Sequence, residues 1–232
     1  ADVVLTDDNF ATIVTAVVEG RRIYAHTIPA INFMLSTNIG ELLVLFIAVM
    51  FNLQSPLLPI HELWINLVTD SLPALALSFD PAAKDIMNRR PIDPRKGIMT
   101  ASFSIRLILQ GMLIAGVSLA AYQIGLGYDI DVARTMTFCV LAFSQFMVIF
   151  GVRSRSQSAF SNMFSNWYLL GAMAIVTLLM IVVVEIPGLM HIFHVTELNG
   201  TQWWWVIGLS FIPLVVMEAA KLVRKLFVKN SK

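Results

Sequence analysis

Two stretches, LWINLVTDSLP at residues 63–73 and STNIGE at residues 36–41, decide how the rest of the chain is interpreted. Each lies inside an apolar run long enough to cross a lipid bilayer. Together they place two carboxylates and two amides at the depth where lipid is expected: Glu41, Asp70, Asn38 and Asn66. An ionised carboxylate inside a bilayer costs on the order of several kcal/mol, so such residues usually line a site or a pathway.

The composition of the whole chain agrees with a membrane protein. Of its 232 residues 57% are hydrophobic and only 13% are charged, whereas a soluble domain carries about 25% charged residues. The mean hydropathy is +0.76. A net charge of +1 gives no indication of nucleic-acid binding. Cys139 is the only cysteine, so an internal disulfide is excluded and a small core residue is expected.

The apolar runs predict an all-α membrane protein with six transmembrane helices, at about 28–51, 63–77, 103–122, 135–152, 167–184 and from 203 onward. The first run continues a helical pattern that starts near Asn9. It therefore predicts one helix of roughly 40 residues, rising about 60 Å and extending as a stalk into the cytoplasm. The alternative is two helices broken at Pro29. The second span is expected to be broken near Pro73, which frees backbone carbonyls.

Loop charges predict the orientation of these spans. Arg134 alone falls on one side of the predicted membrane. The other 15 basic residues fall on the opposite side: Arg21, Arg22, Lys84, Arg89, Arg90, Arg95, Lys96, Arg106, Arg153, Arg155, Lys221, Arg224, Lys225, Lys229 and Lys232. By the positive-inside rule both termini are cytoplasmic. His61, His191 and His194 are then assigned to outer loops, without the clustering of a metal site.

The polar residues in the first two spans have spacings that predict a cation site. Glu41 shares a helix face with Thr37 and Asn38, and Asn66 shares one with Asp70. If the spans are antiparallel neighbours, their oxygens meet. Calcium takes six to eight oxygens at about 2.3–2.6 Å. The candidate ligands are Asn38, Glu41, Asn66, Thr69, Asp70 and, in the fourth span, Gln145. The alternatives are structural carboxylates, amides that bridge helices and a threonine bonded to its own helix.

Four segments carry a resemblance to a known family: VLTDDNFATIV at 4–14, STNIGE at 36–41, LWINLVTDSLPALAL at 63–77 and FDPAAKDIMNRRP at 79–91. They closely resemble the C-terminal membrane region of P-type calcium pumps, of the sarcoplasmic reticulum type and its bacterial relatives. The resemblance implies that the spans are numbers five to ten of ten. It assigns residues 1–22 to the end of the phosphorylation domain and the cytoplasmic stalk, and 23–232 to a six-helix transmembrane domain.

The resemblance also implies roles for the candidate ligands. Asn38, Glu41, Asn66, Thr69 and Asp70 match ion ligands of the family, and Asp70 matches the carboxylate shared between two calcium sites. Gln145 is a departure, because it aligns with a glutamate of the two-calcium pumps and removes a negative charge. Calcium is then the transported ion, whereas magnesium and ATP belong to the full pump only.

The chain carries no DKTGT phosphorylation motif and no other hydrolytic machinery, so alone it should not hydrolyse ATP. It begins with Ala1 and shows no signal peptide. We expect a C-terminal fragment or one half of a split pump, in the plasma membrane. Its partners would be the lipid bilayer and an N-terminal half holding the actuator, nucleotide and phosphorylation domains and spans one to four. The alternatives are a pump for sodium, protons or another divalent cation, a non-catalytic six-helix membrane module, and a passive channel.

Overall fold

The computed structural model describes residues 10–80, 86–88, 98–153 and 165–230, and all regular secondary structure in these ranges is helical. The elements are α1 (Phe10–Met50), α2 (Pro59–Trp64), the π-helix η1 (Ile65–Asp70), α3 (Ser71–Leu77), α4 (Ala101–Leu126), α5 (Ile130–Arg153), α6 (Trp167–Glu185), α7 (Pro187–Phe193) and α8 (Gly200–Asn230). The all-α prediction is therefore confirmed for the described residues.

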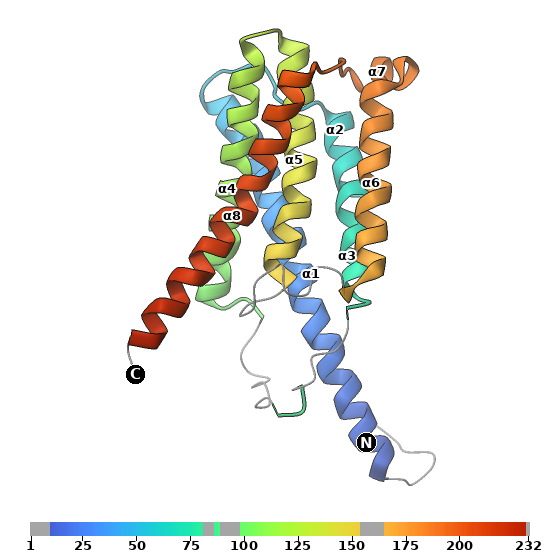
Figure 1. Cartoon of the computed structure of the whole chain (residues 1–232), viewed down its shortest axis with the longest axis vertical. Helices are drawn as coiled ribbons and strands as arrows, with labels where there is room; N and C mark the ends of the chain where they lie inside the picture. The colour runs from blue at the N-terminus through green and yellow to red at the C-terminus, as the bar shows by residue number, and fades with distance from the viewer. Residues whose placement is uncertain (1–9, 81–85, 89–97, 154–164, 231–232) are drawn as a thin grey trace.

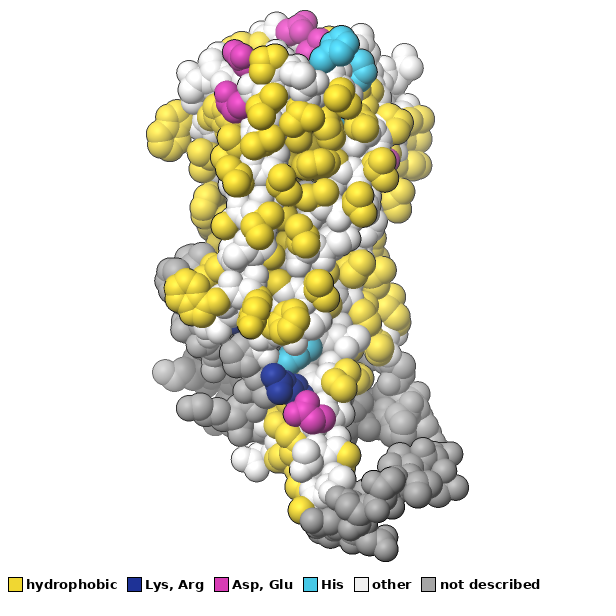
Figure 2. All heavy atoms as spheres, turned by 90° about the vertical axis from the view of Figure 1, so that its right-hand side faces the viewer, with side chains coloured by type: hydrophobic (Ala, Val, Ile, Leu, Met, Phe, Trp, Pro, Cys, Tyr) yellow, Lys and Arg dark blue, Asp and Glu magenta, His cyan; other side chains and the backbone are white. Residues whose placement is uncertain are grey.

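The helices form one elongated bundle, with both termini at the same end and α7 at the opposite end (Figure 1). Among the described residues five helices are long and apolar enough to cross a membrane: α1, α4, α5, α6 and α8. On the face shown in Figure 2, apolar side chains form a broad band between acidic and histidine side chains above and charged side chains below. Such a band is the surface that a bilayer would cover.

Helix α5 is the centre of the bundle. In an 18-residue apolar segment of α5, 89% is buried, whereas the corresponding share is 22–39% in the other four candidate spans. Helices α1, α4 and α8 pack against it. The core therefore forms around α5, while the outer faces of its neighbours stay apolar and exposed.

Helix α1 is continuous over 41 residues, through Pro29. The single helix of about 40 residues is therefore found, and the alternative of two helices is not adopted. Near its lower end Arg21 donates hydrogen bonds to the carbonyls of Ile86 and Met87, at 3.0 and 3.1 Å. Residues 1–9, which carry much of the predicted phosphorylation-domain segment, lie outside the described ranges.

The predicted second span is helical from Pro59 to Leu77, in segments of six, six and seven residues. The helix is not interrupted at Pro73, where a break was expected. Its one irregular segment is the π-helix η1, which ends three residues before Pro73. Proline lacks an N–H and leaves a carbonyl one turn earlier without its donor. At the end of η1, the Ser71 hydroxyl donates to the Asn66 carbonyl at 2.9 Å.

At the α7 end, the segment predicted as an outer loop contains α7, and His61 is buried rather than exposed on a loop. His61 Nδ1 accepts from the Leu58 N–H at 3.3 Å, which leaves Nε2 to donate to the Phe193 carbonyl at 2.7 Å. The Phe193 ring also meets Trp64 edge-on, with centroids 5.1 Å apart. These contacts fasten the end of α7 to α2.

At the opposite end of the same helical stretch, three helix ends are joined by polar contacts. Arg153 of α5 donates to both carboxylate oxygens of Asp80, at 2.7 and 2.8 Å. Asn166, which caps α6, donates to the Ala76 carbonyl and to Asp80, both at 2.9 Å. The stretch from α2 to α3 is thus held at both ends, and η1 lies between the two attachments.

Candidate cation site

The carboxylate of Glu41 joins α1, α5 and η1, and Asn66 of η1 is itself exposed at the edge of this contact. Glu41 lies on α1 and is only 5% exposed. Its Oε1 accepts from Gln145 Nε2 of α5 at 2.9 Å, and its Oε2 accepts from Asn66 Nδ2 of η1 at 3.1 Å. The structure therefore brings together three of the residues that the sequence proposed as ligands.

The second carboxylate, Asp70, ends η1 and is 2% exposed. Its Oδ2 lies 3.0 Å from the Thr37 hydroxyl of α1, whose single proton is shared between Asp70 and the Met34 carbonyl, also at 3.0 Å. The Glu41 carboxylate is bonded across the same interface, to Asn66 of η1. The two carboxylates thus belong to one buried polar cluster, and both are bonded across the interface between α1 and η1.

Two oxygens of this cluster, Asp70 Oδ1 and Gln145 Oε1, are buried without a hydrogen-bond partner among the described residues, and so is Oγ1 of Thr69, the residue before Asp70. An unsatisfied buried polar group costs roughly 1–3 kcal/mol, so a cluster of them is expected to have a partner in the working protein. A hard cation bound by oxygen is a chemically suitable partner. No three His, Cys, Asp or Glu side chains come together as a metal cluster in the described part. Amide and hydroxyl oxygens would therefore complete the coordination.

Asn38 is the predicted ligand that the structure does not bring into the cluster. Its side-chain Nδ2 donates to the Met34 carbonyl of its own helix at 2.7 Å. Thr37, which was not among the predicted ligands, occupies the facing position instead. The available signal was its spacing of four residues from Glu41. That spacing left open whether residue 37 or residue 38 turns toward Asp70.

Two glycines allow the close approach that positions Glu41. A Cβ atom on Gly40 of α1 would lie 2.8 Å from Ile114 Cγ2 of α4, and one on Gly111 would collide with the Ile39 side chain. Small residues let membrane helices pack closely. Since Glu41 follows Gly40 directly, the α1–α4 contact fixes its place opposite Gln145.

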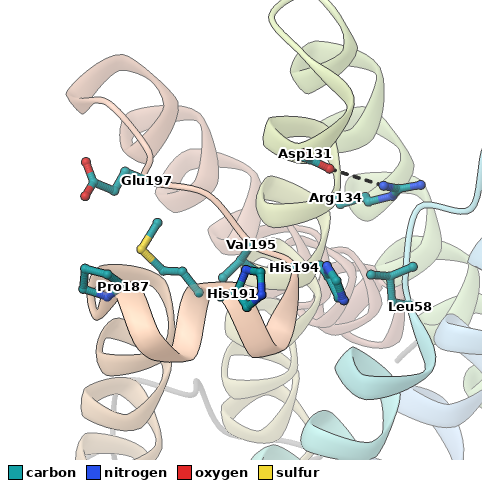
Figure 3. A pocket seen from close by; sticks show the side chains of 9 residues that line it. Leu58, Asp131, Arg134, Pro187, His191, His194, Val195 and Glu197 are labelled. Atoms are coloured by element: carbon teal, nitrogen blue, oxygen red, sulfur yellow. Dashed lines mark hydrogen bonds and ion pairs between the residues drawn. The ribbon is translucent and has the colours of Figure 1, made fainter.

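A cavity of about 610 Å³ lies away from this cluster, at the α7 end of the bundle (Figure 3). Its lining includes the Asp131–Arg134 ion pair at 3.3 Å and the rings of His191 and His194, whose centroids are 6.4 Å apart. None of the proposed ligands lines it. The buried oxygens between α1, η1 and α5 therefore remain the candidate site.

The chain is similar in sequence to several known calcium-transporting ATPases. The chain is 42% identical to "Calcium-transporting ATPase 1" of Bacillus cereus, over 97% of this chain and 27% of that protein. It is 38% identical to "Calcium-transporting ATPase" of Bacillus subtilis, over 97% and 26%. It is 31% identical to "Calcium-transporting ATPase 3, endoplasmic reticulum-type" of Arabidopsis thaliana, over 97% and 26%. The chain spans about a quarter of the length of these relatives.

A family model described as "Cation transporting ATPase, C-terminus" matches residues 54–223. This range covers most of the chain and includes η1 and α5, which carry Asn66, Asp70 and Gln145. The chain therefore belongs to the P-type cation-transporting ATPase family, as a C-terminal membrane region.

Proposed function

We propose that this chain is the cation-binding membrane part of an ATP-driven calcium pump. The observation that supports it best is the buried cluster between α1, η1 and α5, with two carboxylates and two unpartnered oxygens. Calcium is the cation because carboxylate, amide and hydroxyl oxygens suit it, and because the relatives named above are calcium-transporting. The two carboxylates, Glu41 and Asp70, balance the charge of one divalent ion.

The proposed ligands are Glu41, Asn66, Thr69, Asp70 and Gln145, with Thr37 holding Asp70 in place. Asn38 stays outside this set, because its side-chain amide donates to its own helix and not to a side chain of the cluster. The hydrogen bond from Gln145 Nε2 to Glu41 fixes the orientation of the Gln145 amide, and its Oε1 has no partner among the described residues. Gln145 then contributes a neutral ligand where a further carboxylate would add charge.

The proposed arrangement has six crossings, with α2, η1 and α3 together as the second. Their helical stretch would rise about 28 Å at about 1.5 Å per residue, close to the ~30 Å of a bilayer core. The membrane is the plasma membrane. The α7 end then faces the outside of the cell, and both termini face the cytoplasm. The lower part of α1 and residues 1–22 would join the stalk and the phosphorylation domain.

In the proposed mechanism, the remainder of the pump binds magnesium and ATP and transmits phosphorylation to α1. A shift of α1 moves Thr37 and Glu41 relative to Asn66 and Asp70, because these pairs meet across the α1–η1 interface. The cluster then loses its geometry for the cation and opens toward the α7 end. Within the α2–α3 stretch, the attachments of α2 to α7 and of α3 to Asn166 hold both ends in place, so that η1 is the part that responds to α1.

The test is Asp70→Asn in the whole pump, measured as calcium-dependent phosphorylation by ATP. Loss of one carboxylate removes a charged ligand, and phosphorylation is expected to become independent of calcium or to disappear. The matched control is Asp131→Asn, which removes a carboxylate that is 54% exposed and paired only with Arg134. Normal calcium-dependent phosphorylation in Asp70→Asn would contradict the proposal. Dependence on sodium or another cation in the unmodified pump would favour a different cargo.

A further inference from the structure

A line of oxygen-bearing side chains continues from the proposed site toward the α7 end of the bundle. Glu62, Asn66 and Asp70 follow one another at intervals of four residues along α2 and η1. Residues four apart share a helix face. Glu62 therefore lies one turn, about 5–6 Å along the axis, beyond Asn66 on the side of α7.

Contacts of Asn66 link Glu62 to the cluster. Asn66 Nδ2 donates to Glu41 Oε2 at 3.1 Å and to the main-chain carbonyl of Glu62 at 3.0 Å. The main chain of Glu62 is therefore linked to Glu41 through the side chain of Asn66.

The environment of Glu62 differs from that of the other acidic residues at this end. Its Oε1 is buried and has no hydrogen-bond partner among the described residues. By contrast, Asp129, Asp131, Glu185 and Glu197 are exposed to solvent. A partly buried carboxylate with an unpartnered oxygen is costly to retain unless a positive group visits it.

We propose that Glu62 is a further cation-contacting residue, which receives the ion from Glu41 and Asn66 on its way to the α7 side. This inference rests on the proposed function of the site. A cation that leaves Glu41 is then bound by the Glu62 carboxylate and does not have to pass through an apolar stretch. Glu62 thus sets how tightly the ion is held from the outer side, and contributes little to binding from the cytoplasmic side.

The experiment compares Glu62→Gln with the unmodified pump, as the whole protein in sealed vesicles with calcium varied on one side at a time. The cytoplasmic calcium concentration for half-maximal phosphorylation by ATP is expected to stay within about twofold. The outer calcium concentration that halves the steady rate of ATP hydrolysis is expected to rise about tenfold, the usual order for one lost contact to a charged group.

Two further variants make the result decisive. Glu185→Gln removes the same charge at the outer end of another helix and is expected to change neither value. Glu62→Leu removes the unpartnered oxygen without a polar replacement. It is expected to raise the inhibitory outer calcium concentration as Glu62→Gln does, and it provides the result if Glu62→Gln folds poorly. Equal shifts on both sides, or none on the outer side, would overturn the inference alone. An unmodified pump that ignores calcium would overturn the proposed function and this inference with it.

Discussion

The Thr37 hydroxyl is the only hydrogen-bond donor to the Asp70 carboxylate among the described residues. Thr37→Val keeps the shape of the side chain and removes this donor. Without calcium, the loss of a hydrogen bond to a charged group is expected to cost about 1.5–3 kcal/mol of unfolding free energy. With calcium bound, the cation itself contacts Asp70, so a smaller loss is expected. Thermal unfolding of the pump with and without calcium measures both.

Thr37→Ser is the matched control, because it retains the hydroxyl and should keep most of the stability in both conditions. The prediction concerns a difference between conditions rather than a general loss of stability. Equal destabilisation of Thr37→Val in the presence and absence of calcium would mean that the cation does not contact Asp70.

Side-chain spacing predicted most of the cluster and missed its finer assignment. Asn66 and Gln145 each donate a hydrogen bond to the Glu41 carboxylate, so these three proposed ligands lie together. Spacing failed at Asn38, because residues three and four positions from Glu41 both lie on its face. The choice between them depends on the rotation of α1 against η1, which only the packed structure shows.

The contact between α1 and α4 depends on two glycines and carries a prediction about helix packing. Gly40→Ala would place a Cβ atom 2.8 Å from Ile114 Cγ2. Overpacking of this kind typically costs about 1–3 kcal/mol, and it should also displace Glu41 and weaken calcium binding. Measurements are the melting temperature and the calcium dependence of phosphorylation.

Gly116→Ala is the control on α4 itself, since nothing lies within 4 Å of a Cβ atom there. It should be neutral or slightly stabilising, because alanine is favoured over glycine in helices by up to about 1 kcal/mol. If both variants behaved alike, steric contact between α1 and α4 would not be the means by which Glu41 is positioned.

The apolar runs in the sequence predicted the long helices, but they did not predict the π-helix η1 or the short helix α7. The π-helix η1 was expected only as a break near Pro73, because sequence shows where a backbone donor is missing but not how the chain redistributes its hydrogen bonds. Helix α7 has seven residues and begins at Pro187. A segment this short has too few turns to show a helical period, and contacts such as that of Phe193 with His61 support it.

The charges and the apolar band together make a prediction about the whole molecule. Arg134 lies near the α7 end, beside His191 and His194 (Figure 3), whereas both termini lie at the other end (Figure 1). From the distribution of basic residues in the sequence we predict that the α7 end faces away from the cytoplasm. We predict further that the stretch from α2 to α3 crosses the membrane as a sixth span.

Single cysteines on either side of that stretch test the crossing. The only cysteine of this chain, Cys139, is fully buried and should not react, and any cysteine elsewhere in the pump is to be replaced first. Gln54, before α2, and Ser78, after α3, are both exposed. With a membrane-impermeant maleimide, Gln54→Cys should be labelled from outside and Ser78→Cys only from the cytoplasmic side. If both were labelled from one side, the stretch would not cross the bilayer. Asn66 and Asp70 would then lie in a segment that re-emerges on its side of origin, and a continuous path for the cation through the bundle would be excluded.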